Sequence, residues 1–190
     1  MGTWQRILGI VVRPAEEWDL IAGEDTTVEE LLRRFILPLS LLAPIASVIG
    51  MKFFDAGWDP DHGYLVPAQD IYAAGATTLF TSIVSIFALA GIFVLIAPLY
   101  GSSRSYLPAL KVATFGSVPV LLAGVALLIP VLAIVGLIGF CHSLFLWWLG
   151  VRKVLNVGRN HQAEFIGISM LILVVVSTLA GASASAMGLF

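Results

Sequence analysis

Residues 107–149 read LPALKVATFGSVPVLLAGVALLIPVLAIVGLIGFCHSLFLWWL and contain one charged side chain, that of Lys111. As a single helix this stretch would be about 64 Å long at 1.5 Å per residue, roughly twice the thickness of the bilayer hydrocarbon. It must therefore fold back on itself. A proline follows Ile129, and Pro130 is the best place for the break. The stretch predicts one membrane span over 107–129 and another over 131–149, with almost no polar loop between them.

The rest of the chain is equally apolar. Of its 190 residues, 59% are hydrophobic and 12% are charged, against about 45–50% and about 25% in a soluble domain. Long uncharged runs predict three more spans, over 35–51, 72–99 and 165–187. The predicted fold class is an all-α integral membrane protein, a five-helix transmembrane bundle with short amphipathic N-terminal helices.

The N-terminal segment 1–34 is predicted to precede a membrane domain of residues 35–190. An apolar stripe at helical spacing is formed by Trp4, Ile7, Leu8 and Val11. Two placements are open for these helices. They lie in the headgroup plane with Trp4 and Trp18 at the boundary, or they pack against the membrane domain. Thr27 and Glu30 form a capping-box pattern, which predicts a further helix from about Val28.

The positions of lysine and arginine predict the orientation. With five spans, nine of the ten Lys and Arg residues fall on the side of the N-terminus, and only Lys52 falls on the other. Positive charge is enriched in cytoplasmic loops. The N-terminus is therefore predicted in the cytoplasm and the C-terminus outside, in the periplasm of a bacterium.

Several residues inside the spans are candidates for shaping or joining helices. Pro38 and Pro44 in the first span and Pro119 in the third are predicted to bend their helices. Gly181 and Ser185, four residues apart, make a small-residue surface suited to close helix packing. The second span carries a hydroxyl stripe of Thr78, Ser82 and Ser85.

Two ionisable residues fall within the predicted spans. Lys111 lies one turn inside the third span and is predicted to snorkel to the interface, with a substrate contact as the alternative. His142 is predicted to hydrogen-bond another helix or an interfacial water, with a proton-relay or cofactor role as the alternative. No spacing typical of metal ligands, phosphate-binding loops or hydrolase nucleophiles occurs, so no metal, cofactor or catalytic residue is expected. Basic residues are too few and dispersed for nucleic acid.

Short motifs follow one another along nearly the whole chain. They are Arg13-Pro14-Ala15-Glu16-Glu17-Trp18, Ile36-Leu37-Pro38-Leu39, Ala43-Pro44-Ile45-Ala46, Tyr100-Gly101-Ser102, Tyr106, Ala109-Leu110-Lys111-Val112-Ala113, Pro119 and Leu146-Trp147-Trp148-Leu149-Gly150-Val151. In this order, with five spans, the chain resembles the Yip family (Ypt/Rab-interacting proteins) in its compact bacterial form.

The resemblance implies five spans, a cytoplasmic N-terminus and no known catalytic chemistry. Eukaryotic relatives of this family organise vesicle traffic and contact Rab-type GTPases through a long cytosolic N-terminal region. This chain has only about 34 residues before its first span, which argues against GTPase binding.

The predicted function is a non-enzymatic scaffold or accessory subunit of the bacterial inner membrane. Its expected partners are membrane lipids and other membrane proteins, a second copy included. The candidate contact residues are Trp4, Trp18, Arg104, Lys111, Arg152, Gly181 and Ser185. The alternative is a small transporter or channel component for a neutral or lipid substrate, which a water-filled cavity reaching Pro44 or His142 would favour.

Overall fold

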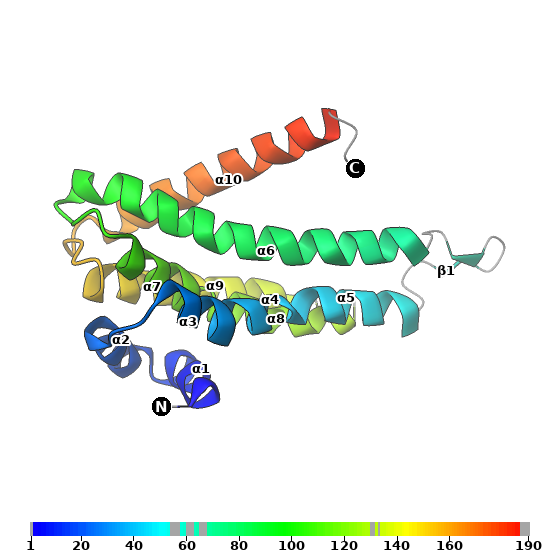
Figure 1. Ribbon diagram of the computed structural model, residues 1–190, viewed down its shortest axis with the longest axis horizontal. Helices are drawn as coiled ribbons and strands as arrows, with labels where there is room; N and C mark the ends of the chain where they lie inside the picture. Colours follow the sequence, from blue (N-terminus) through cyan, green and yellow to red (C-terminus); the bar gives the residue numbers. More distant parts are fainter. Residues whose placement is uncertain are drawn as a thin grey trace.

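The computed structural model describes residues 2–53, 58–59, 63–64, 68–129, 132 and 134–186; for 53, 58–59, 63–64, 68–70 and 180–186 it describes the backbone alone. Within these residues, five helical segments are long and apolar enough to cross a membrane. They are Val28–Lys52, Ile71–Tyr100, Tyr106–Leu128, Ile134–Lys153 and Gln162–Leu179. Figure 1 shows most of them side by side along the longest axis. The predicted all-α bundle of five spans is confirmed.

Two short helices precede the first span and form what we call the N-terminal hairpin, α1 (Thr3–Val12) and α2 (Pro14–Gly23). Pro14 occupies the first turn of α2, where a missing N–H costs nothing. In Figure 1 the hairpin lies against the side of the bundle, near the end where α7 begins. Helix α1 packs on α8 and helix α2 on α9, so the hairpin touches the membrane-spanning part of the protein.

The first span is irregular. It consists of α3 (Val28–Leu31), a π-helical turn over Leu32–Ile36, α4 (Leu37–Ser40) and α5 (Leu42–Phe53). Thr27 caps its start, because its hydroxyl accepts a hydrogen bond from the Glu30 N–H at 3.2 Å. Pro38 is the second residue after the π-turn, and Pro44 lies three residues after the break at Leu41. Each proline removes a backbone donor, and the regular hydrogen-bond ladder changes beside each of them.

The second span starts from a small hairpin and ends in a tight turn. Strands β1 (Trp58–Asp59) and β2 (Gly63–Tyr64) pair antiparallel between α5 and α6. Helix α6 (Ala68–Ile96) continues into a 3-10 turn over Ala97–Tyr100. Gly101 then adopts a left-handed conformation, with φ of 72°, and ends the segment.

The third and fourth spans form the expected fold-back. The third comprises α7 (Tyr106–Gly116), α8 (Val118–Ala123) and a 3-10 helix over Gly124–Leu128, and the fourth is α9 (Ile134–Lys153). The chain reverses between Leu128 and Ile134; Pro130 itself lies outside the described residues. Pro119 lies just after the break at Ser117, where the Val120 N–H donates to the Ser143 hydroxyl of α9 at 3.1 Å. A neighbouring helix thus satisfies a backbone group at the break.

Helix α7 is central and helix α10 (Gln162–Ala186) is peripheral. Every residue from Ala109 to Pro119 is buried, whereas α10 packs on α6 and α9 and then leaves the bundle. Val174 and Leu179, in its second half, are 62% and 65% exposed. Gly181 and Ser185 lie outside the residues whose side chains are described, so their predicted packing surface stays a prediction.

Candidate functional site

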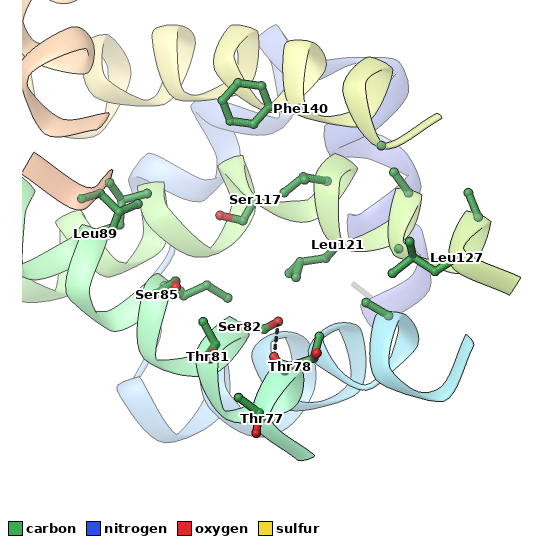
Figure 2. A pocket seen from close by; sticks show the side chains of 18 of the residues that line it. Thr77, Thr78, Thr81, Ser82, Ser85, Leu89, Ser117, Leu121, Leu127 and Phe140 are labelled. Atoms are coloured by element: carbon green, nitrogen blue, oxygen red, sulfur yellow. Dashed lines mark hydrogen bonds between the residues drawn. The ribbon is translucent and has the colours of Figure 1, made fainter. Parts of the chain in front are cut away.

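A cavity of about 600 Å³ lies inside the bundle between α6, α8 and α9. Figure 2 shows the hydroxyl side chains of α6 on one side of it and Ser117, Leu121 and Phe140 on the other. Ala43 of α5 and Leu173 of α10 complete the walls. The predicted hydroxyl stripe of the second span therefore faces an internal space.

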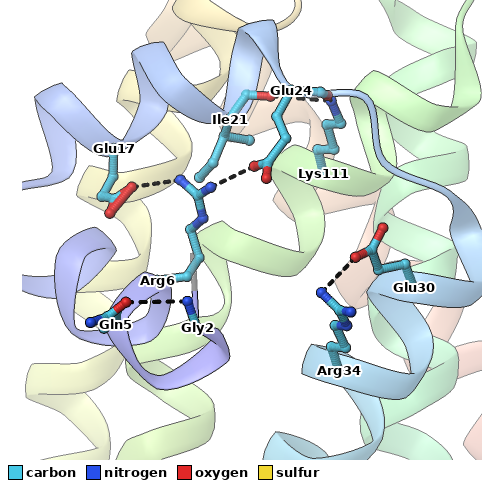
Figure 3. Close-up of polar contacts among 9 residues, drawn as sticks. All are labelled: Gly2, Gln5, Arg6, Glu17, Ile21, Glu24, Glu30, Arg34 and Lys111. Atoms are coloured by element: carbon cyan, nitrogen blue, oxygen red, sulfur yellow. Dashed lines mark hydrogen bonds and ion pairs between the residues drawn. The ribbon is translucent and has the colours of Figure 1, made fainter.

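The N-terminal hairpin is held together by a buried ion pair (Figure 3). An Arg6 guanidinium nitrogen lies 2.7 Å from a Glu17 carboxylate oxygen, and both side chains are at most 7% exposed. A second guanidinium nitrogen lies 2.5 Å from the carboxylate of Glu24, which is half exposed. Two carboxylates thus neutralise one arginine that has been removed from water, as a buried charge requires.

Lys111 joins the hairpin to the third span. Its ammonium group donates to the carbonyl of Ile21 at 3.1 Å and to the carbonyl of Glu24. Both carbonyls belong to the C-terminal end of α2, where the helix dipole favours a cation. The side chain is 6% exposed. The ammonium group therefore ends on the hairpin rather than in water, in a contact that sequence spacing does not predict. The predicted snorkelling to the interface stays a prediction.

Lys153 makes the equivalent connection from the fourth span. Its ammonium group donates to the carbonyl of Ala15 at 2.6 Å and lies 2.7 Å from a carboxylate oxygen of Asp19. Sequence analysis did not select this residue. The one hint of this contact in the sequence is the acidic run of Glu16, Glu17 and Asp19, whose charge is opposite to that of the basic end of the fourth span.

Trp18 anchors the hairpin by burial. Its side chain is 0% exposed, and its indole meets the ring of Phe115 edge-on, with centroids 6.4 Å apart. A Cβ atom on Gly150 would lie 2.7 Å from the indole, so only glycine leaves room for the ring on α9. Trp18 is thus no lipid contact: of the two placements left open, the packed one holds for this residue, because the ring faces the bundle.

The outer surface of the hairpin is apolar. Trp4, Leu8 and Val12 of α1 are 62%, 47% and 71% exposed, whereas Ile7 and Ile10 are buried. The predicted single stripe is therefore divided between two faces of α1. We call Trp4, Leu8 and Val12 the outer stripe. Since α1 packs on α8 within a membrane span, the outer stripe lies beside the bundle rather than beyond its end.

Exposed arginines surround the end of the bundle nearest the hairpin. Arg104, Arg152 and Arg159 are exposed there. Arg33 and Arg34 form the ion pairs expected from their spacing, at 3.2 Å to Glu29 and 2.8 Å to Glu30. We call this end, with the hairpin, the basic face.

His142 lies half-buried on α9, with its ring edge-on to Phe145. Its Nε2 is enclosed and has no hydrogen-bond partner within the described part of the chain. Among those residues no other helix supplies the expected bond to this nitrogen, and the alternative bond to an interfacial water stays a prediction. In the same residues, no three His, Cys, Asp or Glu side chains are grouped as metal ligands.

Five apolar spans and a docked amphipathic hairpin define the class, a polytopic helical membrane protein. The sequence profile of the Yip1 domain matches residues 8–181, so the chain belongs to the Yip1 domain family, as its motifs indicated. It is similar to the inner membrane protein YohC of Escherichia coli strain K12 and of strain CFT073. Each is 23% identical over 179 residues, which cover 90% of this chain and 89% of the relative. No solved structure matches.

Proposed function

We propose that the protein is a non-enzymatic scaffold or accessory subunit of the inner membrane that binds other membrane proteins through the N-terminal hairpin and the basic face. The observation that supports this most is the docking of the hairpin. Lys111 and Lys153 hold its backbone from two different spans, while Trp4 and Val12 point away from the bundle and stay exposed. A surface of fixed shape loses little entropy when a partner binds to it.

The proposed location and orientation follow from the relatives and the charges. The E. coli relatives are named as inner membrane proteins. The basic face and the segments next to it together contain nine of the ten Lys and Arg residues of the chain. We place this face in the cytoplasm, in line with the bias of cytoplasmic loops toward positive charge.

Cysteine labelling tests the orientation. In a Cys141→Ser background, Arg104→Cys on the basic face should react with a membrane-impermeant maleimide only after the inner membrane is opened. Asp59→Cys, in β1 at the other end of the bundle in Figure 1, should react in intact spheroplasts. Labelling of Arg104→Cys in intact spheroplasts would contradict the orientation.

A pull-down in mild detergent tests the scaffold role. The triple variant Trp4→Ala, Leu8→Ala, Val12→Ala should lose a co-purifying membrane protein by about tenfold or more, since each ~1.4 kcal/mol of lost binding energy is tenfold. Its matched control is Phe80→Ala, Val84→Ala, Leu95→Ala, which shortens three exposed apolar side chains of α6. If both triples retain the same partner as the wild type, the outer stripe is not the binding surface.

The second candidate is a small transporter or channel component for a neutral or lipid substrate. The cavity beside α6 is the observation that favours it. Pro44 and His142, which such a cavity was expected to reach, are not among its lining residues; Ala43 and Phe140 are. The cavity walls include no ionisable side chain among the described residues, which favours a neutral substrate over an ion.

A further inference from the structure

The cavity lies at the depth of the bilayer hydrocarbon. Its walls come from the middle of the second span, between Thr77 and Leu89, and from the part of the third span after Ser117. In the fourth span the walls begin at Gly136, two residues after the helix starts. The cavity therefore begins in the half of the bundle away from the basic face and extends to the middle, as far as Leu89 and Trp147.

The arrangement of the helices leaves one side of this cavity weakly covered. Helix α6 packs on α5, α7 and α10, and helix α9 packs on α7, α8 and α2. Helix α10 bridges α6 and α9 only with its first half, since Val174, Val175 and Leu179 are 62%, 47% and 65% exposed. Figure 1 shows α10 diverging from α6 toward its C-terminal end. The weakly covered side between α6 and α9 is thus an opening of the cavity, and it faces the acyl chains of the leaflet opposite the basic face.

The walls suit a hydrocarbon. Several hydroxyls already donate to carbonyls of their own helix: Thr78 to Ala74 and Ser82 to Thr78, both at 2.8 Å, and Ser117 to Ala113 at 2.7 Å. Because their hydrogen atoms are already donated, these side chains offer the cavity their methyl and methylene groups, and their hydroxyl oxygens can still accept hydrogen bonds. Leucine, glycine, alanine and aromatic residues make up most of the rest. A charged headgroup would find no counter-charge among the described walls.

We propose that this cavity binds one acyl chain of a bilayer phospholipid, which enters between α6 and α9 from the leaflet opposite the basic face. A void of this size would leave its apolar lining without contacts on one side, and water is poorly held where most of the wall is apolar. This inference goes beyond the proposed scaffold role, because it requires no protein partner. It names an occupant for the cavity of the second candidate function, but it requires binding alone and no transport.

Photo-crosslinking tests the proposal. The purified protein is placed in phosphatidylcholine vesicles that contain phosphatidylcholine with a diazirine near the end of one chain, and the labelled residues are mapped by mass spectrometry. Ser85 and Leu121, half-buried and directed into the cavity in Figure 2, should be labelled. Phe80, 70% exposed on the outside of α6, reports ordinary contact with surrounding lipid.

Two matched variants decide the result. Gly136 lies in the cavity wall, and a Cβ atom added there would have no atom within 4 Å. A Cβ atom on Gly167 would also have no atom within 4 Å, but Gly167 does not line the cavity. Gly136→Phe should reduce labelling of Ser85 and Leu121 several-fold and leave Phe80 unchanged, whereas Gly167→Phe should change neither. If Gly136→Phe does not fold, Leu121→Trp fills the same space from α8 and should reduce labelling of Ser85. Labelling of Ser85 and Leu121 at the level of the fully buried Leu110, or labelling that either filling variant leaves unchanged, would overturn the proposal.

Discussion

Replacement of Trp18 by alanine is expected to release the N-terminal hairpin from the bundle. The indole is fully buried between Phe115 and Gly150, and removal of a buried tryptophan side chain costs about 3–5 kcal/mol. The hairpin has few other apolar anchors, chiefly Ile10 and Ile21. We therefore expect it to open locally while the five spans stay assembled. Hydrogen exchange in micelles measures this as faster exchange of α1 and α2 amides alone.

Two further variants separate docking from the loss of a large side chain. Gly150→Leu keeps the indole but fills its space on α9, and it should release the hairpin to a similar extent. Trp4→Ala removes the same type of side chain from an exposed position, 62% accessible, and should change the exchange of α2 little. Equal protection of α2 in the wild type and Trp18→Ala would show that the two lysines alone hold the hairpin.

Arg6→Leu is expected to have the second large effect. It leaves Glu17, whose side chain is 5% exposed, without its charge partner at 2.7 Å. Breaking a buried ion pair by removing one partner costs about 3–5 kcal/mol, because the remaining charge stays out of water. The α1–α2 contact should therefore separate, which limited proteolysis after Arg13 would detect.

The double variant Arg6→Leu, Glu17→Leu supplies the control. Since both charges are removed, the desolvation cost disappears and apolar side chains take their place. Most of the protection should return, and with the single variant Glu17→Leu completing the cycle, the coupling free energy should approach the sum of the two single losses. If the double variant is as labile as Arg6→Leu, then Glu24, the second partner of Arg6, carries the stabilisation instead.

The spans could be predicted because each depends on a local property. An uncharged run of about 20 residues fixes a span whatever surrounds it, and the 107–149 run was too long for one helix. The chain does reverse between Leu128 and Ile134. Likewise, the cap at Thr27 and the pairs of Arg33 and Arg34 involve residues three or four apart.

The docking of the hairpin could not be predicted, because it joins residues far apart in the chain. Lys111 contacts Ile21, 90 residues away, and spacing within the third span says nothing about such a partner. A lysine near a span end that meets water snorkels, and one that meets a helix C-terminus donates to its carbonyls. For the same reason the outer and inner faces of α1 look like a single stripe in the sequence. Arg6, between Trp4 and Ile7, was the sole local sign of a polar inner face.

The connection from Lys153 to Ala15 sets an order for biosynthesis. The two residues are 138 positions apart, so at roughly 5–20 residues per second the ribosome adds Lys153 about 7–30 s after Ala15. During that time the first 24 residues have left the ribosome, while the spans that will receive them are still being made. The last of these contacts forms only when the fourth span is in the bilayer. A nascent chain stalled before that point would expose the hairpin to proteases, which links the survival of the N-terminus to complete insertion.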